Sequence, residues 1–153
     1  MQNPESLEAN IIYLTGQFSH AFHQALTLGF KRQKVSVTVE QFSVLAVLFY
    51  KNGINQKELG ALLLRDKTTV ARIITNMVNN KLVKRVTDKN DLRANLLYLT
   101  NKGKLIQKKA IKLSGNLYRQ AIKDIPETQL KQGREVLSKM MKNISGTFGR
   151  TQT

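Results

Sequence analysis

The chain has 153 residues, which suits a single domain with an added oligomerisation element and excludes two large domains. It contains no cysteine, so disulfides, thiolate nucleophiles and cysteine-bound zinc are excluded. Its 25 Lys and Arg residues outnumber 10 Asp and Glu residues, and the resulting net charge of +15 predicts a surface that attracts polyanions.

The first predicted element is a long helix over about residues 7–28. Apolar residues recur there at steps of three and four, which places them on one narrow helix face. A second helix is predicted to start after Thr38, because Thr38 and Gln41 have the spacing of a capping box. It should run to about Tyr50 and be the most buried helix, since it is apolar nearly all round. Gly53 follows its end and is expected to adopt a positive φ.

Two short helices should follow, separated by a tight turn. Asn55 and Glu58 repeat the capping-box spacing and predict a third helix over about residues 56–63. Asp66 then predicts the cap of a fourth helix, which should end near residues 79–81. Two short helices joined in this way form a helix-turn-helix.

Two strands are predicted next, over residues 82–86 (LVKRV) and 95–99 (NLLYL), because each short apolar run borders the polar turn TDKNDLRA. A helix-turn-helix followed by such a hairpin is a winged helix. Thr100 should cap a fifth helix over residues 101–125, and Pro126 should begin a sixth, since proline suits the first turn of a helix. Both of these helices carry apolar seams at steps of three and four.

The outward face of the predicted fourth helix carries a functional signal. At 100° per residue its apolar residues fall on one side, and small hydroxyls, an amide and one Arg fall opposite, with no acidic residue among them. Such a face can enter the major groove of DNA, where Arg forks onto guanine and Asn onto adenine. The alternative is a solvated helix face, which would be expected to mix Glu with Lys at i,i+4 spacing. The candidate major-groove residues are Lys67, Thr68, Thr69, Arg72, Thr75 and Asn76.

The predicted hairpin strengthens the DNA interpretation. Lys84, Arg85, Lys89 and Arg93 place four cations around a turn that needed only polar residues. Neutralising phosphates would supply non-specific affinity, and an Arg at a wing tip can reach into a minor groove. Asp91 could orient the Arg93 guanidinium. The alternative is a solvated hairpin with a turn-stabilising Asp.

The charge is unevenly distributed along the chain. Residues 1–50 hold 3 basic and 3 acidic residues, residues 51–104 hold 12 and 4, and residues 105–153 hold 10 and 3. A neutral first third argues against indiscriminate stickiness and for a basic face that begins near the helix-turn-helix.

Several motifs within residues 54–104 resemble one family. They are QKEL at residues 56–59, DKTTVxR at 66–72, the D-x-R pattern at 91–93 and LT-x-KG at 99–103. Together they resemble the DNA-binding core of the MarR family of bacterial and archaeal transcriptional regulators. The chain departs from the usual family pattern at Gly60, where Ala is common, at Leu64 and Arg65, which replace a Gly-containing turn, and at Leu92, which replaces an Arg.

The resemblance implies an obligate homodimer in which the first, fifth and sixth helices of both subunits interlock. It also implies a recognition helix over residues 67–80 in the major groove and a wing that carries Arg93 into the minor groove. We therefore predict a mainly α fold with a small β-wing. Residues 36–100 would form the winged helix-turn-helix domain, and residues 1–35 and 101–149 a helical dimerisation region.

We expect a sequence-specific transcriptional regulator, a repressor, that binds an inverted-repeat operator in double-stranded DNA as a homodimer. A prokaryotic, cytoplasmic protein is expected, since no signal peptide or membrane-spanning segment is evident in the sequence. It should not be an enzyme, because no nucleophile, base and orienting group can be recognised together. Two alternatives remain open: a basic architectural protein that binds DNA or RNA without specificity, and a module for protein interaction.

Many members of the family release DNA when a small molecule binds, so an effector is a further expectation, although no cofactor is. Candidate pocket residues are Tyr13, Phe18, Phe22 and Phe42, with Phe30 beside them, but aromatic residues at helical spacing more often belong to the core. His20 and His23 share a helix face and could hold a metal, but no third ligand is apparent, so no metal site is predicted.

Overall fold

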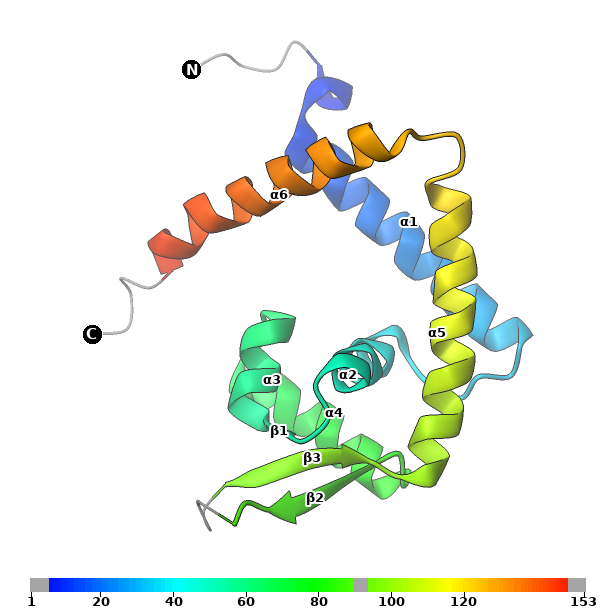
Figure 1. Cartoon of the computed structure of the whole chain (residues 1–153), viewed down its shortest axis with the longest axis vertical. Coiled ribbons are helices and arrows are strands. Elements are labelled where there is room, and N and C mark those ends of the chain that lie inside the picture. The colour runs from blue at the N-terminus through cyan, green and yellow to red at the C-terminus, as the bar shows by residue number, and fades with distance from the viewer. Residues whose placement is uncertain (1–5, 90–93, 149–153) are drawn as a thin grey trace. The chain divides into compact units, whose positions relative to one another are not determined.

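The computed structural model describes residues 6–89 and 94–148 and divides into two compact units, Met1–Leu117 and Tyr118–Thr153 (Figure 1). Among the described residues, the first unit contains the three strands, four complete α-helices and most of a fifth. The predicted class, mainly helical with a small antiparallel sheet, is confirmed. The proposed boundaries of the DNA-binding and dimerisation regions stay a prediction.

Helix α1 spans Ile11–Arg32 and begins later than predicted. The Asn10 side chain accepts hydrogen bonds from the backbone N–H groups of Ile12 and Tyr13, which caps the helix. The preceding residues Leu7–Ala9 form a separate turn of 3₁₀ helix. The apolar periodicity was therefore correct, but it did not reveal that an N-cap interrupts it.

The next three helices begin at the caps that the sequence predicted. Helix α2 spans Val39–Tyr50 and α3 spans Gln56–Leu63, and both begin with the predicted capping box. Helix α4 spans Lys67–Asn79, after the Asp66 cap. Gly53 has the expected positive φ of 86°.

The turn between α3 and α4 forms without a glycine at its centre. Leu64 adopts a left-handed conformation with a φ of 50°, and the Arg65 N–H donates to the Gly60 carbonyl at 3.0 Å. A Cβ on Gly60 would lie 3.2 Å from the Arg65 carbonyl oxygen. The helix-turn-helix is therefore intact at the positions where the sequence departs from the usual family pattern.

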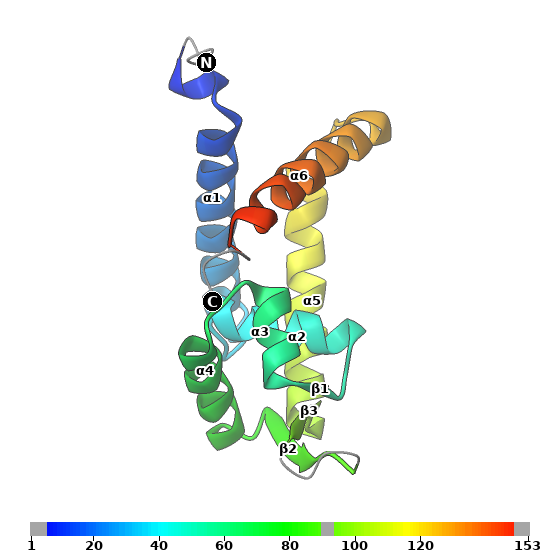
Figure 2. The ribbon, with the colours of Figure 1, turned by 90° about the vertical axis from the view of Figure 1, so that its left-hand side faces the viewer.

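The small sheet has three strands in the order β1-β3-β2, all antiparallel. Strand β2 spans Val83–Thr87, which is shifted by one residue from the predicted strand 82–86. Strand β3 spans Asn95–Leu99, as predicted. Strand β1, Ile54–Asn55, was not predicted, because two residues are too short to show an alternating pattern. The hairpin lies at the start of α5 (Figure 2). Its turn residues 90–93, which include Asp91, Leu92 and Arg93, lie outside the described residues.

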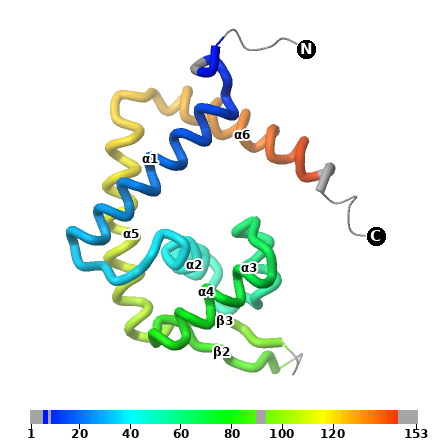
Figure 3. Tube along the Cα trace, turned by 180° about the vertical axis from the view of Figure 1, so that it is seen from behind, coloured from blue at the N-terminus to red at the C-terminus, as the bar shows by residue number. Residues whose placement is uncertain are grey.

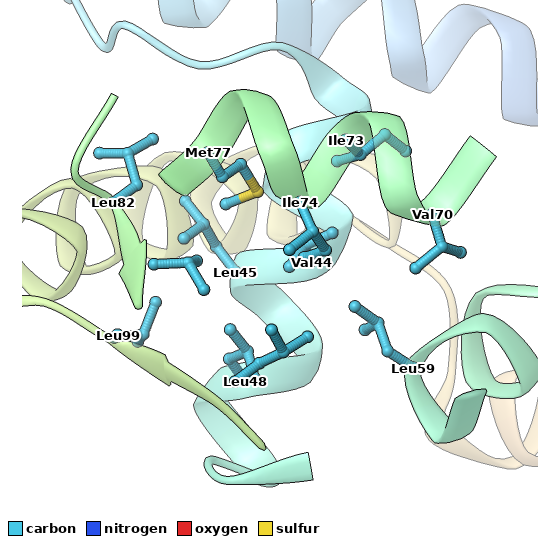
Figure 4. Close-up of a cluster of buried hydrophobic side chains, with 12 residues drawn as sticks. Val44, Leu45, Leu48, Leu59, Val70, Ile73, Ile74, Met77, Leu82 and Leu99 are labelled. Atoms are coloured by element: carbon cyan, nitrogen blue, oxygen red, sulfur yellow. The ribbon is translucent and has the colours of Figure 1, made fainter. Parts of the chain in front are cut away.

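One core cluster holds the winged helix together (Figure 4). It joins the buried sides of α2, α3 and α4 to the two longer strands, so the helix-turn-helix and the wing share one interior. Each fully buried Leu or Ile contributes about 1.5–3 kcal/mol relative to an exposed one. Its members are Val44, Leu45, Leu48, Leu59, Val70, Ile73, Ile74, Met77, Leu82, Val83, Leu97 and Leu99.

Helix α5 spans Asn101–Ala121 and begins at the predicted Thr100 cap. The Thr100 hydroxyl accepts the Gly103 N–H at 3.0 Å and donates to the Lys81 carbonyl at 2.5 Å. The helix ends four residues before the prediction, at a turn in which Asp124 has a φ of 62°.

A second buried cluster joins the end of α1 to α2 and α5 within the first unit. Figure 3 shows from behind that the backbones of these three helices come together there. Phe30 and Phe42 meet edge to face there, with ring centroids 5.5 Å apart. The approach is close enough that a Cβ on Gly29 would lie 2.9 Å from Leu113 Cδ2.

The second unit consists mainly of α6, Glu127–Phe148. The Pro126 carbonyl accepts the first hydrogen bonds of this helix, from Gln129 and Leu130, as expected for a proline that starts a helix. None of the α6 side chains that the structure describes is buried. The helices of the described residues include none that combines the length and the apolar character needed to span a bilayer.

Candidate nucleic-acid interface

Helix α4 has the two faces that its sequence predicted. Val70, Ile74 and Met77 are at most 1% exposed and point into the core. Of the six candidate major-groove residues, five are exposed and Thr69 is half-buried. The exposed ones are Lys67, Thr68, Arg72, Thr75 and Asn76, and no acidic residue lies within the helix. The outward face of α4 is therefore a polar surface with a positive charge.

The cap at the start of α4 involves Thr69 directly. The Asp66 carboxylate accepts the Thr69 N–H at 2.9 Å and the Thr69 hydroxyl at 2.6 Å. These hydrogen bonds stabilise the ionised carboxylate and lower its pKa below the ordinary value of 3.8. Thr69 is thus part of the cap that positions the helix.

The first turn of α2 contacts the exposed side of α4, which the sequence did not indicate. The Arg72 guanidinium lies 3.4 Å from the Glu40 carboxylate, and both side chains are about half exposed or more. The Gln41 side-chain amide donates to the side-chain oxygen of Asn76, Oδ1, at 2.6 Å. Two candidate recognition residues are therefore held by partners more than 30 positions away, a distance at which no local spacing could reveal the pairing.

The wing cations do not form a single group. Arg85 pairs with Leu97, which is buried, so it lies on the side of the sheet that faces the helices. Its guanidinium donates to Thr75 Oγ1 at 3.2 Å and to Gln56 Oε1 at 3.4 Å. Lys84 pairs with Tyr98 on the opposite side.

Arg85 thus connects the wing to the recognition helix, while Lys84 and Lys89 are exposed. The predicted roles of Asp91 and Arg93 fall on positions outside the described residues.

The predicted effector residues are dispersed. Tyr13 and Phe18 are exposed on α1, Phe22 is half-buried and lies 5.9 Å from Phe18 by ring centroids, and Phe42 is buried in the second cluster. None of them lines the open pocket between the end of α1 and the start of α2.

That pocket, of about 510 Å³, is open and lies between the end of α1 and the start of α2. Its lining combines apolar side chains, Phe30, Val35, Val37 and Val39, with one cation, Lys31, and one carboxylate, Glu40. Phe30, which the sequence placed beside the aromatic candidates, is therefore the member of that set that borders a cavity.

Metal ligation has no visible support in the part of the chain that the structure describes. There, no three His, Asp or Glu residues lie together in a group that could hold an ion. His20 instead shares a hydrogen bond of 3.0 Å with Gln24, one helical turn away.

Comparison with known proteins gives consistent matches. A model of the MarR family matches residues 37–94, which covers the helix-turn-helix and most of the wing. The HTH-type transcriptional regulator TtmR of Methylorubrum extorquens (strain PA1) is 28% identical over 102 residues, which is 67% of this chain and 51% of that regulator. The chain therefore spans about half the length of this curated relative.

Solved structures match along most of the chain. The crystal structure of a putative MarR family transcriptional regulator from Listeria monocytogenes, complexed with 26mer DNA, is 26% identical with a TM-score of 0.81, and the match covers 90% of this chain and 91% of that one. A MarR family regulator from Silicibacter pomeroyi is 21% identical with a TM-score of 0.79 over 91% and 92% of the two chains. The winged helix of this chain is therefore similar to the MarR family model, and its fold is similar to that of MarR-family regulators over about 90% of its length.

Proposed function

We propose that this protein is a sequence-specific transcriptional regulator that binds double-stranded DNA with α4 in the major groove. The observation that carries the proposal is the outward face of α4, whose side chains are exposed, polar and free of acidic residues. The Listeria regulator, whose structure contains DNA, supports the same use of this fold.

Exposed cations around α4 support binding to the phosphate backbone. Lys84 and Lys89 belong to the wing, and Lys102 and Lys104 lie in the first turn of α5, where the Lys102 ammonium reaches the Asn80 carbonyl at 3.0 Å. Neutralising phosphates with such residues gives affinity that falls steeply with salt. We expect these phosphate contacts to position the protein on DNA, and we expect α4 to supply the sequence preference.

A homodimer is part of the proposal. Helix α1 exposes Ile12, Leu14 and Phe18, and α6 exposes Leu137 and Ile144, each by 41% or more. Rows of exposed apolar side chains on each of these helices support association with a second copy of the chain. A twofold dimer would present two recognition helices and therefore select an inverted-repeat operator.

Repression is the regulatory outcome that we propose, because a dimer seated over a promoter would exclude the polymerase. Such a regulator would act in the cytoplasm, where a prokaryotic promoter lies. The open pocket beside Phe30 and Lys31, with its largely apolar lining, supports release by a small molecule with an apolar body.

The test is an in vitro selection of the purified protein against random duplexes at near-physiological salt, followed by titration of the enriched site. We expect an inverted repeat bound by one dimer, preferred over random DNA by about a thousandfold or more. Binding without enrichment would favour the alternative of a non-specific architectural protein. Absence of binding would contradict both.

A single variant ties the preference to α4. Arg72→Ala should relax the preference at one base position of the operator half-site, by about 1–3 kcal/mol if the guanidinium reads guanine. Arg134→Ala is the matched control, because Arg134 is also exposed and paired with a glutamate, Glu127, but lies on α6. Unchanged discrimination in Arg72→Ala would remove Arg72 from the recognition set.

A further inference from the structure

The side-chain carbonyl of Asn76 is occupied from two directions within the protein. Asn76 Oδ1 accepts a hydrogen bond from Gln41 Nε2 at 2.6 Å and another from Asn80 Nδ2 at 2.9 Å. Gln41 belongs to the first turn of α2, and Asn80 is the residue that ends α4. A carbonyl oxygen has two lone pairs, so these donors use its full capacity as an acceptor.

Backbone groups fix which way each of these amides points. Gln41 Oε1 accepts the Thr38 backbone N–H at 3.0 Å, as part of the capping box, so the other end of that amide must be the donor. Asn80 Nδ2 donates to the Asn76 backbone carbonyl at 3.0 Å, so it too must be a donor. An N–H and a C=O of the main chain cannot exchange roles. The acceptor that faces both donors must therefore be the oxygen of Asn76 and not its nitrogen.

The Asn76 nitrogen is then left to face solvent. The Asn76 side chain is exposed, and no acceptor among the described residues receives a hydrogen bond from its Nδ2 group. Reading adenine with both ends of an Asn amide requires the oxygen to accept from N6 while the nitrogen donates to N7. In this protein the oxygen is already committed.

We propose that Asn76 acts on DNA as a hydrogen-bond donor only, and that Gln41 and Asn80 are the positioning residues that impose this choice. Its partner would be an acceptor, either a base edge such as guanine O6 and N7 or thymine O4, or a phosphate oxygen. The inference rests on the proposed function, and it gives the α4 surface a chemical preference that its residue types alone did not indicate.

Two variants separate the parts of this arrangement. Asn76→Ala removes the donor from an exposed position. Gln41→Glu keeps an oxygen to accept the Thr38 N–H, and Glu at this position is itself usual in a capping box, but it replaces the donor that faces Asn76 with an acceptor. The new carboxylate attracts the Asn76 nitrogen more strongly than the one remaining donor, Asn80 Nδ2, attracts the oxygen, so the Asn76 amide should turn and its oxygen should face outward. Gln132→Glu, exposed on α6, adds the same charge and serves as the control.

The experiment repeats the selection with each variant and measures affinity for the operator enriched by the unmodified protein. Asn76→Ala should bind that operator about tenfold less tightly, the size expected for one lost hydrogen bond in a desolvated interface. If the partner is a base, the loss should be confined to sites with guanine or thymine at one position. If the partner is a phosphate, the loss should be uniform across sequences.

Gln41→Glu should also weaken binding to the operator, but part of that loss comes from the charge added beside α4, which Gln132→Glu on α6 does not reproduce, so the base preference is the deciding measurement. In the base-contact case it should also enrich adenine or cytosine, which present donors in the major groove. A merely structural role of Gln41 would lower the thermal midpoint and leave the base preference unchanged.

Two results would overturn the inference while leaving the proposed function in place. One is an enriched operator whose preference for adenine is lost in Asn76→Ala. The other is an operator bound equally well by Asn76→Ala. If the unmodified protein enriches no sequence and binds no DNA, the proposed function itself fails. That outcome is recognised because there is then no operator preference for Arg72→Ala to relax.

Discussion

Helices α4 and α6 have similar apolar spacing, but the apolar face of α4 is buried and that of α6 is exposed. The apolar residues of α4 are buried against α2, α3 and the sheet, and Val70, Ile74 and Met77 are at most 1% exposed. Along α6, Leu137, Met141 and Ile144 remain 41–57% exposed. An amphipathic pattern thus shows that a helix has a face to bury but not where its partner lies. The winged helix buries its apolar residues within one chain, while the apolar face of α6 remains without a partner surface among the described residues.

The largest effect that we predict comes from the interior of the winged helix. A Cβ added to Gly103 would lie 1.9 Å from the Leu82 carbonyl oxygen, which is backbone and cannot move aside. Gly103→Ala should therefore lower the free energy of unfolding by about 3 kcal/mol, at the upper end for overpacking. Urea unfolding followed by circular dichroism measures this difference.

The matched control is Gly16→Ala in α1, where no atom lies within 4 Å of the added Cβ. There the better helix propensity of Ala should raise stability by up to about 1 kcal/mol. Similar losses of stability at both positions would mean that the close contact between α5 and the base of the wing is not what makes Gly103 necessary.

The second prediction concerns the seam of α6. The double variant Leu137→Lys, Ile144→Lys places two charges on the exposed apolar face, so the dimer should dissociate, and operator affinity should fall by at least about tenfold, since both half-sites must be held together. Sedimentation velocity measures the association state. Gln132→Lys with Asn143→Lys adds the same charge on the opposite side of the helix and should leave the dimer intact.

If the seam variant remains a dimer at micromolar concentration, α6 does not supply the interface. In that case the exposed apolar residues of α1 would be the remaining candidates. The winged helix should keep its thermal transition in either case, because its core contains no α6 residue.

Local signals explain why so much of the winged helix could be predicted. The caps at Thr38, Asn55 and Asp66 act within four residues of the chain, and the helices that they begin start where the sequence indicated. The buried side of α4 also followed from its spacing alone. By contrast, β1 is too short to show a pattern, and its pairing with β3 depends on residues about 40 positions away.

The sequence predicted which types of residue form the site, but it did not predict which residues from other helices contact them. The exposed, acid-free face of α4 was correctly expected, whereas the contacts of Glu40 and Gln41 with that face were not. These contacts depend on how α2 crosses α4, which is a property of the packed core. The predicted effector residues show the same limit, since the aromatic candidates included Phe30, which borders the pocket, but gave no sign that the following loop and the start of α2 supply the rest of its lining.

A smaller difference is expected at the ion pair between α2 and α4. Both Glu40 and Arg72 are exposed, by 49% and 68% of their side chains, so the pair should contribute at most about 0.5 kcal/mol to stability. Glu40→Gln should leave the thermal midpoint nearly unchanged but raise affinity for random duplex DNA at low salt, because it removes an acidic charge beside α4.

Glu127→Gln on α6 removes the same charge from a comparable pair with Arg134 and provides the control. Equal changes in DNA affinity for the two variants would mean that only net charge matters. A change specific to Glu40 would locate the DNA at the α2–α4 surface.

The smallest effect concerns the cap of α4. Because hydrogen bonds from Thr69 lower the Asp66 pKa below 3.8 in the folded state, the ionised carboxylate stabilises the fold. That contribution is complete above the pKa of the unfolded chain and is lost as the pH falls through the lower folded value. Asp66→Asn keeps an oxygen for the Thr69 N–H but cannot ionise. Unfolding measured from pH 7 to pH 3 should therefore show the unmodified protein as the more stable at pH 7, with the gap narrowing only below about pH 4. A gap that is constant across this range would mean that the charge of Asp66 does not strengthen the cap, and that α4 is held by its buried face alone.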